Sequence, residues 1–411
     1  MNKTLKPKNI LQNVLEKKIT KKEAFKLLES LINESNIPEI RANAIQTLER
    51  LSIFNESTFF LLEKSLITDE SDLVRFMAVR VLIKHFPLTK NTSLIYAIEH
   101  EESIYFLKKV LNLCIKSEKK QLKVLRGKIL KRISTFYNLN SDDAQFILDI
   151  DYLDYMKFRE NFKDFIKKFQ INETEKQKLI RENAKLGYKG LGRVVKSEDG
   201  FIIGLRLEDF SEIPLSIQNL KKLEYLEIKR SNLSNLNNNF ENLLNLKYLN
   251  LNNNQIESIP DWIIELVSKR NYALKYAKNG VIYKEAKLLG LLEILLGQAL
   301  VKLDNRESFN HSLLYYYKTN YDGHLIGISI SSDLNKIGIF PIQLCSLKFL
   351  EELYLPNQDL SNIPECISEL KQLKILDLRN NIIESLPESI DELRNLKNLK
   401  LDGNPLYKNN K

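Results

Sequence analysis

The chain has 411 residues, of which 43% are hydrophobic and 28% are charged, with 13 Gly and 10 Pro. This amount of apolar material suffices for two or three packed units of ordinary size and excludes a chain that is disordered throughout. The charge is uneven, because residues 1–186 contain 34 Lys and Arg against 25 Asp and Glu while residues 187–411 contain 28 of each, so the basic character belongs to the N-terminal half.

The ends of the chain and its cysteines bear on location. Residues 1–7 lack the apolar run of a secretory signal, and the longest apolar stretch, residues 288–301, is too short for a membrane span. Cys114, Cys345 and Cys366 are too few for a disulfide framework or a structural zinc site and favour a reducing compartment. We therefore expect a cytoplasmic protein without a transmembrane segment.

Residues 1–117 repeat with a period of 34 residues. The stretches 40–44 and 74–78 are similar to the V-R-x-x-A signature of HEAT-type helical repeats, and acids precede the second one, as suits a helix start. Tetratricopeptide repeats share this period, but their Trp and A-x-x-x-F positions are missing here. The resemblance implies an all-α HEAT-like superhelix. The recurring residues are Phe25, Leu28, Glu29, Arg41, Ala44 and Leu48, matched by Phe59, Leu62, Glu63, Arg75, Ala78 and Leu82.

Residues 118–186 are expected to form a helical connector without a detectable repeat. Their aromatic residues fall at three- and four-residue spacings, which favours a buried stripe over a recognition surface. The stripe consists of Tyr152, Tyr155, Phe158, Phe162, Phe165, Ile166 and Phe169.

A basic amphipathic helix is predicted within residues 108–132, which contain ten Lys and Arg and a single acid, Glu118. Its apolar positions 122, 125, 129 and 133 form one stripe. Two interpretations stay open: a packed helix with a solvated outer face, or a surface for nucleic-acid phosphates, anionic lipid or an acidic protein. The candidate basic patch consists of Lys119, Lys120, Lys123, Arg126 and Lys131.

A second period, of 23 residues, organises residues 187–266 and 312–411. In the first array, Leu223, Leu226 and Ile228 recur as Leu246, Leu249 and Leu251. An L-x-L segment points two apolar side chains inward from a short strand, and neighbouring coils then stack into a parallel sheet. In the second array, Leu353, Leu355, Leu360, Ile363, Ile367 and Leu370 recur 23 residues later as Leu376, Leu378, Ile383, Leu386, Ile390 and Leu393.

The spacing L-x-x-L-x-L-x-x-N-x-L-x-x-L-P resembles the leucine-rich repeat, in particular the plant intracellular Ras-group-related and scaffold-type subclass. Asn254, Asn381 and Asn404 stand where a side-chain amide can bond the backbone of adjacent coils; Glu208, Ser231 and Gln358 replace it elsewhere. The resemblance implies protein recognition, with small GTPases or signalling proteins as plausible partners.

Each array is expected to begin with a β-hairpin. Asp-Gly pairs at 199–200 and 322–323 separate β-prone segments, so residues 193–196 and 315–318 are predicted first strands. Such hairpins would cover the open end of a solenoid. Two covers favour two short arrays over one long horseshoe with an insertion. Between the arrays, residues 267–311 are predicted to be helical, with a buried second helix over 284–296.

The expected fold class is therefore an α/β solenoid, in which a HEAT-like superhelix precedes two leucine-rich arrays separated by a helical segment. No catalytic arrangement is recognisable. The four histidines, His85, His100, His311 and His324, are scattered, and the glycines of residues 187–192 follow a helix and lack the G-x-G-x-x-G spacing. We expect no enzyme activity, cofactor or metal.

Outward side chains of the strands are the candidate partner-binding residues, because coil packing constrains only the inward ones. The favoured hypothesis is a non-enzymatic scaffold for protein partners. The alternatives are a helical-repeat protein that binds nucleic acid through residues 108–132, or an adaptor that lies on a membrane surface. The candidates are Tyr225, Glu227, Lys229, Tyr248, Asn250 and Asn252 in the first array, and Tyr354, Asp377, Arg379 and Lys400 in the second.

Overall fold

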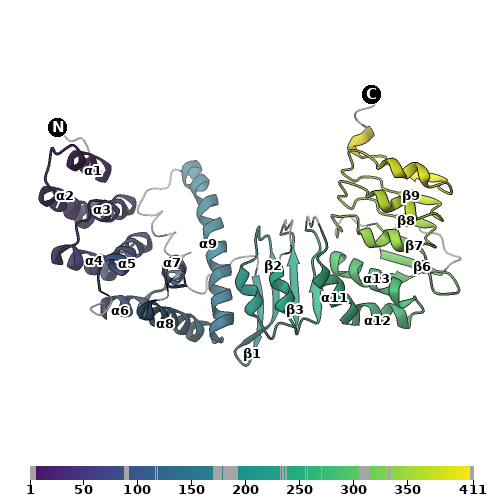
Figure 1. Cartoon of the computed structure of the whole chain (residues 1–411), viewed down its shortest axis with the longest axis horizontal. Coiled ribbons are helices and arrows are strands. Elements are labelled where there is room, and N and C mark those ends of the chain that lie inside the picture. The colour runs from purple at the N-terminus through teal and green to yellow at the C-terminus, as the bar shows by residue number, and fades with distance from the viewer. Residues whose placement is uncertain are drawn as a thin grey trace. The chain divides into compact units, whose positions relative to one another are not determined.

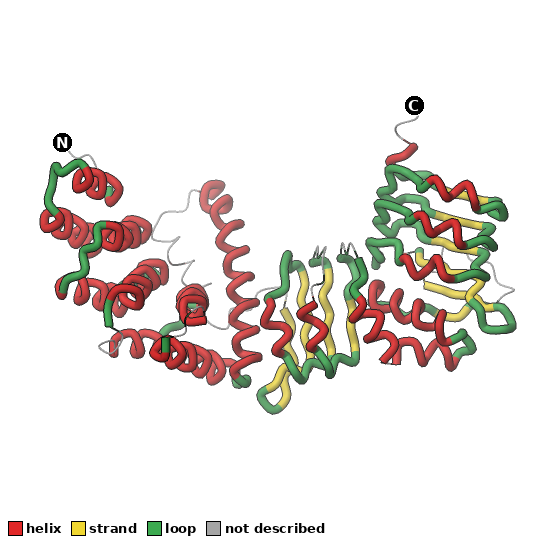
Figure 2. Tube along the Cα trace, viewed as in Figure 1, coloured by secondary structure: helices red, strands yellow, loops and turns green. Residues whose placement is uncertain are grey.

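The computed structural model describes residues 6–87, 92–115, 117, 119–169, 178, 193–231, 233, 236, 238–254, 256, 258–269, 271–304, 315–331 and 335–407, with side chains up to 162 in the ninth helix. The chain divides into two compact units, Met1–Gly190 and Leu191–Lys411, and each is described by itself. The first is helical and the second contains both sheets (Figures 1 and 2).

The first unit is built from consecutive helices that pack in pairs. Helix α2 packs on α3, α4 on α5 and α8 on α9, while α3, α5 and α7 contact one another in sequence. The helices are α1 (Pro7–Leu15), α2 (Lys21–Glu34), α3 (Pro38–Arg50), α4 (Glu56–Thr68), α5 (Asp72–His85), α6 (Thr92–His100), α7 (Ile104–Ile115), α8 (Lys120–Tyr137) and α9 (Ser141–Phe169).

The repeated arginine explains the 34-residue period. Arg41 donates two hydrogen bonds of 2.7 Å to the Asp69 carboxylate. Its equivalent, Arg75, donates bonds of 2.9 and 2.7 Å to Glu101. Both pairs are largely buried, and planar two-point bonding of this kind fixes geometry as well as charge. Each arginine therefore ties one helical pair to the next.

The aromatic stripe of α9 packs inward over the described side chains. Tyr155 is fully buried and contacts Tyr105 of α7, and Tyr152 and Phe158 pack against this cluster. The core interpretation is thus confirmed for these residues. Phe165, Ile166 and Phe169 lie outside the described side chains.

Two separate sheets form the second unit (Figure 2). In each, the coil strands are parallel, and one antiparallel pair opens the array. The first sheet has the order β1-β2-β3-β4 and the second β10-β9-β8-β7-β6-β5. The strands are β1 (Arg193–Glu198), β2 (Phe201–Glu208), β3 (Tyr225–Lys229), β4 (Tyr248–Asn250), β5 (Val301–Lys302), β6 (Tyr315–Thr319), β7 (Leu325–Ile330), β8 (Glu352–Tyr354), β9 (Ile375–Asp377) and β10 (Asn398–Lys400).

Short helical turns return each coil to the start of the next strand. Three helices lie between the arrays: α11 (Asp261–Lys269), α12 (Asn271–Lys278) and α13 (Tyr283–Leu296). The 3-10 turns are η2 (Leu215–Asn219), η3 (Asn238–Asn242), η4 (Ile342–Ser346), η5 (Glu365–Glu369), η6 (Glu388–Glu392) and η7 (Pro405–Tyr407).

The strands β1–β2 and β6–β7 are antiparallel hairpins. Asp199 and Gly200 have φ of 49° and 76°, the left-handed conformation that a tight two-residue hairpin requires and that Asp-Gly tolerates. Strand β5 pairs parallel with β6 and lies outside the predicted strands; the described residues of the first array contain no equivalent strand.

Buried asparagines join successive coils. The Asn381 Nδ2 donates to the carbonyls of Leu355 and Leu378, both at 2.8 Å, while its Oδ1 accepts from the backbone N–H of Gln358 and Leu360 at 2.9 and 3.1 Å. Asn254 and Asn404 make equivalent bonds in their own coils.

Polar substitutes maintain the same bonding where the asparagine is absent. Gln358 accepts from the N–H of Ile337 at 3.2 Å, and the Ser231 hydroxyl accepts from that of Phe210 at 3.2 Å. At these two positions the replacing side chain therefore still bonds the backbone of the preceding coil.

Helix α13 covers the last coil of the first array. It is buried along most of its length and packs on α12 and β4. The Leu251 N–H donates to the Ile294 carbonyl at 2.9 Å, and the Tyr272 hydroxyl of α12 bonds the backbone of Leu249. The predicted buried helix over 284–296 is confirmed.

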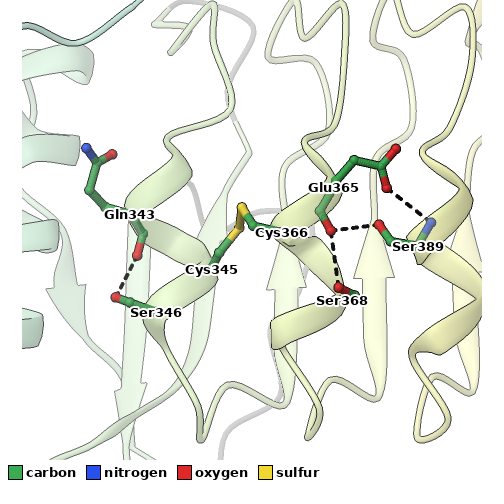
Figure 3. Close-up of a disulfide and its surroundings, with 7 residues drawn as sticks. All are labelled: Gln343, Cys345, Ser346, Glu365, Cys366, Ser368 and Ser389. Carbon is green, nitrogen blue, oxygen red and sulfur yellow. Dashed lines mark hydrogen bonds between the residues drawn. A yellow bond between two sulfur atoms is a disulfide. The ribbon is translucent and has the colours of Figure 1, made fainter.

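Two of the three cysteines form a disulfide, which the expectation of a reducing compartment did not predict. Cys345 of η4 and Cys366 of η5 form a disulfide, with Cα atoms 5.7 Å apart (Figure 3). The two residues are 21 positions apart, close to one coil period, so stacking of consecutive turns makes them neighbours. Cys114 is free and buried.

Candidate functional site

A row of polar side chains points outward from the second sheet, and two of its four members, Ser329 and Asp377, are buried. Ser329, Tyr354, Asp377 and Lys400 lie in register on β7, β8, β9 and β10. Because side chains alternate along a strand, this row faces away from the buried Leu353 and Leu376. We call this row and its flanking outward residues the second sheet face.

Asp377 organises the centre of this face. Its carboxylate accepts bonds from the Arg379 guanidinium, with Nη2 at 2.7 Å and Nε at 2.9 and 3.1 Å, and the Lys400 Nζ lies 3.8 Å away. The bond to Asp377 raises the pKa of Arg379. The two cations are therefore held over a fixed negative charge, and their outer surfaces remain partly exposed.

Tyr354 lies beside these charges and is half-buried. Burial, together with the carboxylates of Glu352 and Asp377, raises its pKa to about 12, so the phenol is neutral at physiological pH. A ring held on a strand among charged neighbours is a rigid amphipathic contact that loses little conformational entropy on binding.

The predicted role of Asp377 in direct contact needs correction. Its side chain is 0% exposed, because Arg379 and Lys400 cover it. Asp377 positions the two cations and has no surface to offer to a partner. The 23-residue period marks it as outward-facing but carries no information on which neighbours fold over it.

The outward face of the first sheet is a network of charges beside two tyrosines. Glu227 accepts from the Arg206 Nε at 2.5 Å and lies 3.1 Å from the Lys229 Nζ. Burial alone would raise the pKa of Glu227, but the bonds from Arg206 and Lys229 outweigh it and lower the pKa. Tyr225 and Tyr248 have ring centroids 6.3 Å apart, and Tyr225 is 47% exposed.

Asn250 and Asn252 also prove to be covered, which corrects a second expectation. They are 2% and 7% exposed. A Cβ added to Gly297, directly after α13, would lie 2.3 Å from the Asn250 Oδ1, and Asn252 donates to the Asn335 Oδ1 at 2.8 Å. The two amides are therefore buried where the first array meets the segments that follow it, because the helices between the arrays cover that end of the sheet.

Other outward residues of the second sheet face were not among the candidates. Glu352 lies two residues before Tyr354 on β8, and its carboxylate is 3.5 Å from the Lys318 Nζ of the hairpin strand. Tyr316, half-buried, is opposite Ser329 in the hairpin. The alternation of inward and outward residues along the predicted strands of the hairpin and of the coils is the sequence signal that identifies them.

The basic patch belongs to the first unit. All five of its residues are exposed, four of them on α8 and Lys119 at its N-cap, while the apolar stripe Leu122, Leu125, Ile129 and Ile133 is buried. The predicted amphipathic helix is thus confirmed.

Within the described parts of the chain, no three His, Cys, Asp or Glu residues are grouped so that they could hold a metal ion. His85 and His324 bond Glu49 and Glu285, and His100 bonds a backbone carbonyl; His311 lies outside the described residues. No helix among these parts has both the length and the apolar character needed to cross a bilayer.

Comparison with solved structures returned leucine-rich repeat proteins. A leucine-rich repeat protein of Leptospira interrogans is 26% identical over 47% of this chain and 46% of its own, with a TM-score of 0.19. An internalin of Listeria monocytogenes is 20% identical over 48% and 45%, with a TM-score of 0.20. The leucine-rich repeat ectodomain of an Arabidopsis thaliana membrane receptor kinase is 18% identical over 53% and 19%, with a TM-score of 0.18.

This chain spans less than half the length of each of these three proteins. No curated protein matches the chain. The family model described as leucine rich repeat matches residues 348–406, which contain β8, β9 and β10 with the coils that connect them. Residues 348–406 of the second array are therefore similar to the leucine-rich repeat family.

Proposed function

We propose that the protein is a non-enzymatic scaffold that binds protein partners through the outward faces of its two sheets, chiefly the second sheet face. The observation that carries this proposal is the arrangement of Tyr354 beside Arg379 and Lys400 over the buried Asp377. Tyrosine and arginine are the residue types that most often dominate binding energy at protein interfaces.

Pre-organisation supports this choice. Arg379 is clamped by three hydrogen bonds to Asp377, and Tyr354 is held in a paired strand. Binding then costs little side-chain entropy, which otherwise opposes association by about 0.5–1.5 kcal/mol per ordered long side chain.

The first unit is proposed as a HEAT-like superhelix with a binding surface of its own. The Arg41–Asp69 and Arg75–Glu101 pairs, one per repeat, support this interpretation. The leucine-rich segments resemble a subclass that implies signalling proteins, small GTPases included, and we extend the proposal to this class of partner. The extension rests on the resemblance alone.

The Cys345–Cys366 disulfide bears on location. Disulfides persist mainly in oxidising compartments, so the cytoplasmic location expected from the cysteine count is not carried forward. We propose that the second array functions in an oxidising compartment, where this disulfide forms.

Site-specific photocrosslinking tests the scaffold proposal. A benzoylphenylalanine replaces Asn398, which is exposed on the second sheet face, and in a separate protein it replaces Arg394, which is exposed after η6. We expect a discrete partner to crosslink from position 398 and not from 394, and to be lost in the Tyr354→Ala, Arg379→Glu double variant.

A matched double variant on the turn side of the same array, Ile342→Ala with Arg394→Glu, changes two exposed residues and keeps the crosslink at position 398. Equal loss in both double variants, or equal crosslinking from both positions, would place binding away from the second sheet face.

A further inference from the structure

The outer face of α8 is a ridge of positive charge. Lys120, Lys123 and Lys131 are exposed along one side of the helix, with Lys119 and Arg126 beside them. From residue 120 to residue 131 the ridge is about 16 Å long at 1.5 Å per residue. We call these five side chains the basic ridge.

Most cations of the ridge are not paired with acids of the described residues. Lys119, Lys120, Arg126 and Lys131 form no salt bridge with the residues that the structure describes. The neighbouring Lys128 pairs with Glu99 of α6 at 2.8 Å, and this bond lowers the pKa of Glu99. The one acid of α6 is therefore engaged mainly by a cation outside the ridge, with a weaker contribution from Lys131.

Positive charges at the N-terminus of α8 are energetically unfavourable for the helix itself. The first turn of α8 contains no acid, and its N-cap, Lys119, makes no side-chain capping bond, although cations near a helix N-terminus are unfavourable. Lysines at 119 and 123 repel each other at i,i+4 spacing. The buried apolar stripe supplies the stability of α8, and a surface that departs from local preference is where function is expected.

An apolar spot interrupts the ridge. Val124 is 55% exposed, and nothing lies within 4 Å of a Cβ built on Gly127, one turn further along the same side. Together they leave a shallow apolar surface in the middle of the charges, which an aliphatic side chain could cover.

We propose that the basic ridge binds an acidic segment of a partner protein, with an apolar side chain of that segment over Val124 and Gly127. A phosphate backbone has no aliphatic side chain to offer at this spot. A bilayer would need an apolar helix face to insert, and that face of α8 is buried within the unit. This proposal is independent of the function assigned to the sheets.

A defined probe tests it with the full-length chain. The probe is a fluorescein-labelled helical peptide of about twelve residues, matched to the ridge in length, in which Glu residues surround two central Leu; a twin has Ser in place of Leu. Anisotropy gives the Kd at several salt concentrations. Duplex DNA of equal charge and phosphatidylserine vesicles are measured in parallel.

The ridge variant is Lys119→Glu, Lys120→Glu, Arg126→Glu, Lys131→Glu. Its control makes the same change of charge at Lys6, Lys8, Lys21 and Lys22, which are also exposed in the first unit. We expect the ridge variant to raise the Kd of the Leu peptide by about tenfold or more and the control by less than about twofold. Circular dichroism verifies that both variants fold.

Val124→Ser distinguishes the apolar contact from the electrostatic attraction between the basic ridge and the acidic peptide. It should abolish the preference for the Leu peptide over its Ser twin while leaving the salt dependence intact. Tighter binding of duplex DNA or of vesicles than of the peptide, lost on ridge reversal, would assign the ridge to phosphates or lipid. Equal losses in the ridge variant and its control, or an unchanged Leu preference in Val124→Ser, would overturn the proposal.

Discussion

Replacing Asn381 by Ala tests whether buried amides hold the coils of the second array together. The substitution removes two donated bonds of 2.8 Å, a longer third one of 3.4 Å and two accepted bonds, all with backbone groups of the preceding coil or of the coil that contains Asn381. At about 1 kcal/mol per lost bond, and more where a buried group stays unpaired, the expected loss of unfolding free energy is about 4 kcal/mol. Most single substitutions cost about 0.5–3 kcal/mol.

Urea unfolding and hydrogen exchange measure this loss. The amides of Gln358 and Leu360, which donate to the Asn381 Oδ1, should lose protection before those of more distant coils. Asn395→Ala is the control, because Asn395 is exposed and donates to the Lys371 carbonyl alone at 2.7 Å, with an expected cost of about 1 kcal/mol or less. A cost for Asn381→Ala equal to that of the control would refute the reasoning.

Three further outcomes are expected. Replacing Cys345 and Cys366 by Ser should destabilise the second array by about 3 kcal/mol, the chain-entropy value for a loop of this length. Reductant should destabilise the parent protein by the same amount and leave the variant unchanged. Free thiols at both positions in non-reducing peptide mapping would contradict this prediction. Arg75→Ala leaves the largely buried Glu101 without its partner and should lower the free energy of unfolding, measured in urea, by about 3 kcal/mol. A loss below about 1 kcal/mol would mean that the arginine–carboxylate pairs contribute little to the stability of the first unit. Tyr354 has a pKa raised to about 12 and should therefore ionise at higher pH in the folded protein than in the unfolded chain. The free energy of unfolding should fall as pH rises from about 10 to 12. Alkaline denaturation should show a smaller fall in Tyr354→Phe.

Periodicity predicts the inward half of this fold well. The 23-residue spacing places Leu353, Leu376 and their equivalents in the core, where they are fully buried, because coil stacking leaves those positions no alternative. The Asp-Gly pairs likewise predict hairpins, since their left-handed backbone at 199 and 200 suits a two-residue turn.

The candidate surface could be predicted only in part. Tyr225 and Tyr354 face outward, but Asn250 is closed off by the residue after α13 and Asp377 by its own neighbours. Outward direction is a local property of a strand, whereas exposure depends on contacts with segments far away in the chain. The disulfide escaped prediction for the same reason: Cys345 and Cys366 become neighbours only after their coils have stacked.

The hairpin of β6 and β7 has a consequence for how the second array can change in length. The hairpin precedes the run of parallel coil strands, while β5 lies at the edge of the sheet beyond it, so a coil can be added among β8, β9 and β10 without altering the hairpin. Duplication of one 23-residue module between residues 371 and 406 would preserve each inter-coil contact and widen the sheet by about 4.8 Å. Recombination between such similar modules can therefore enlarge or shrink the footprint offered to a ligand in whole-strand steps, without altering the hairpin from which the array grows.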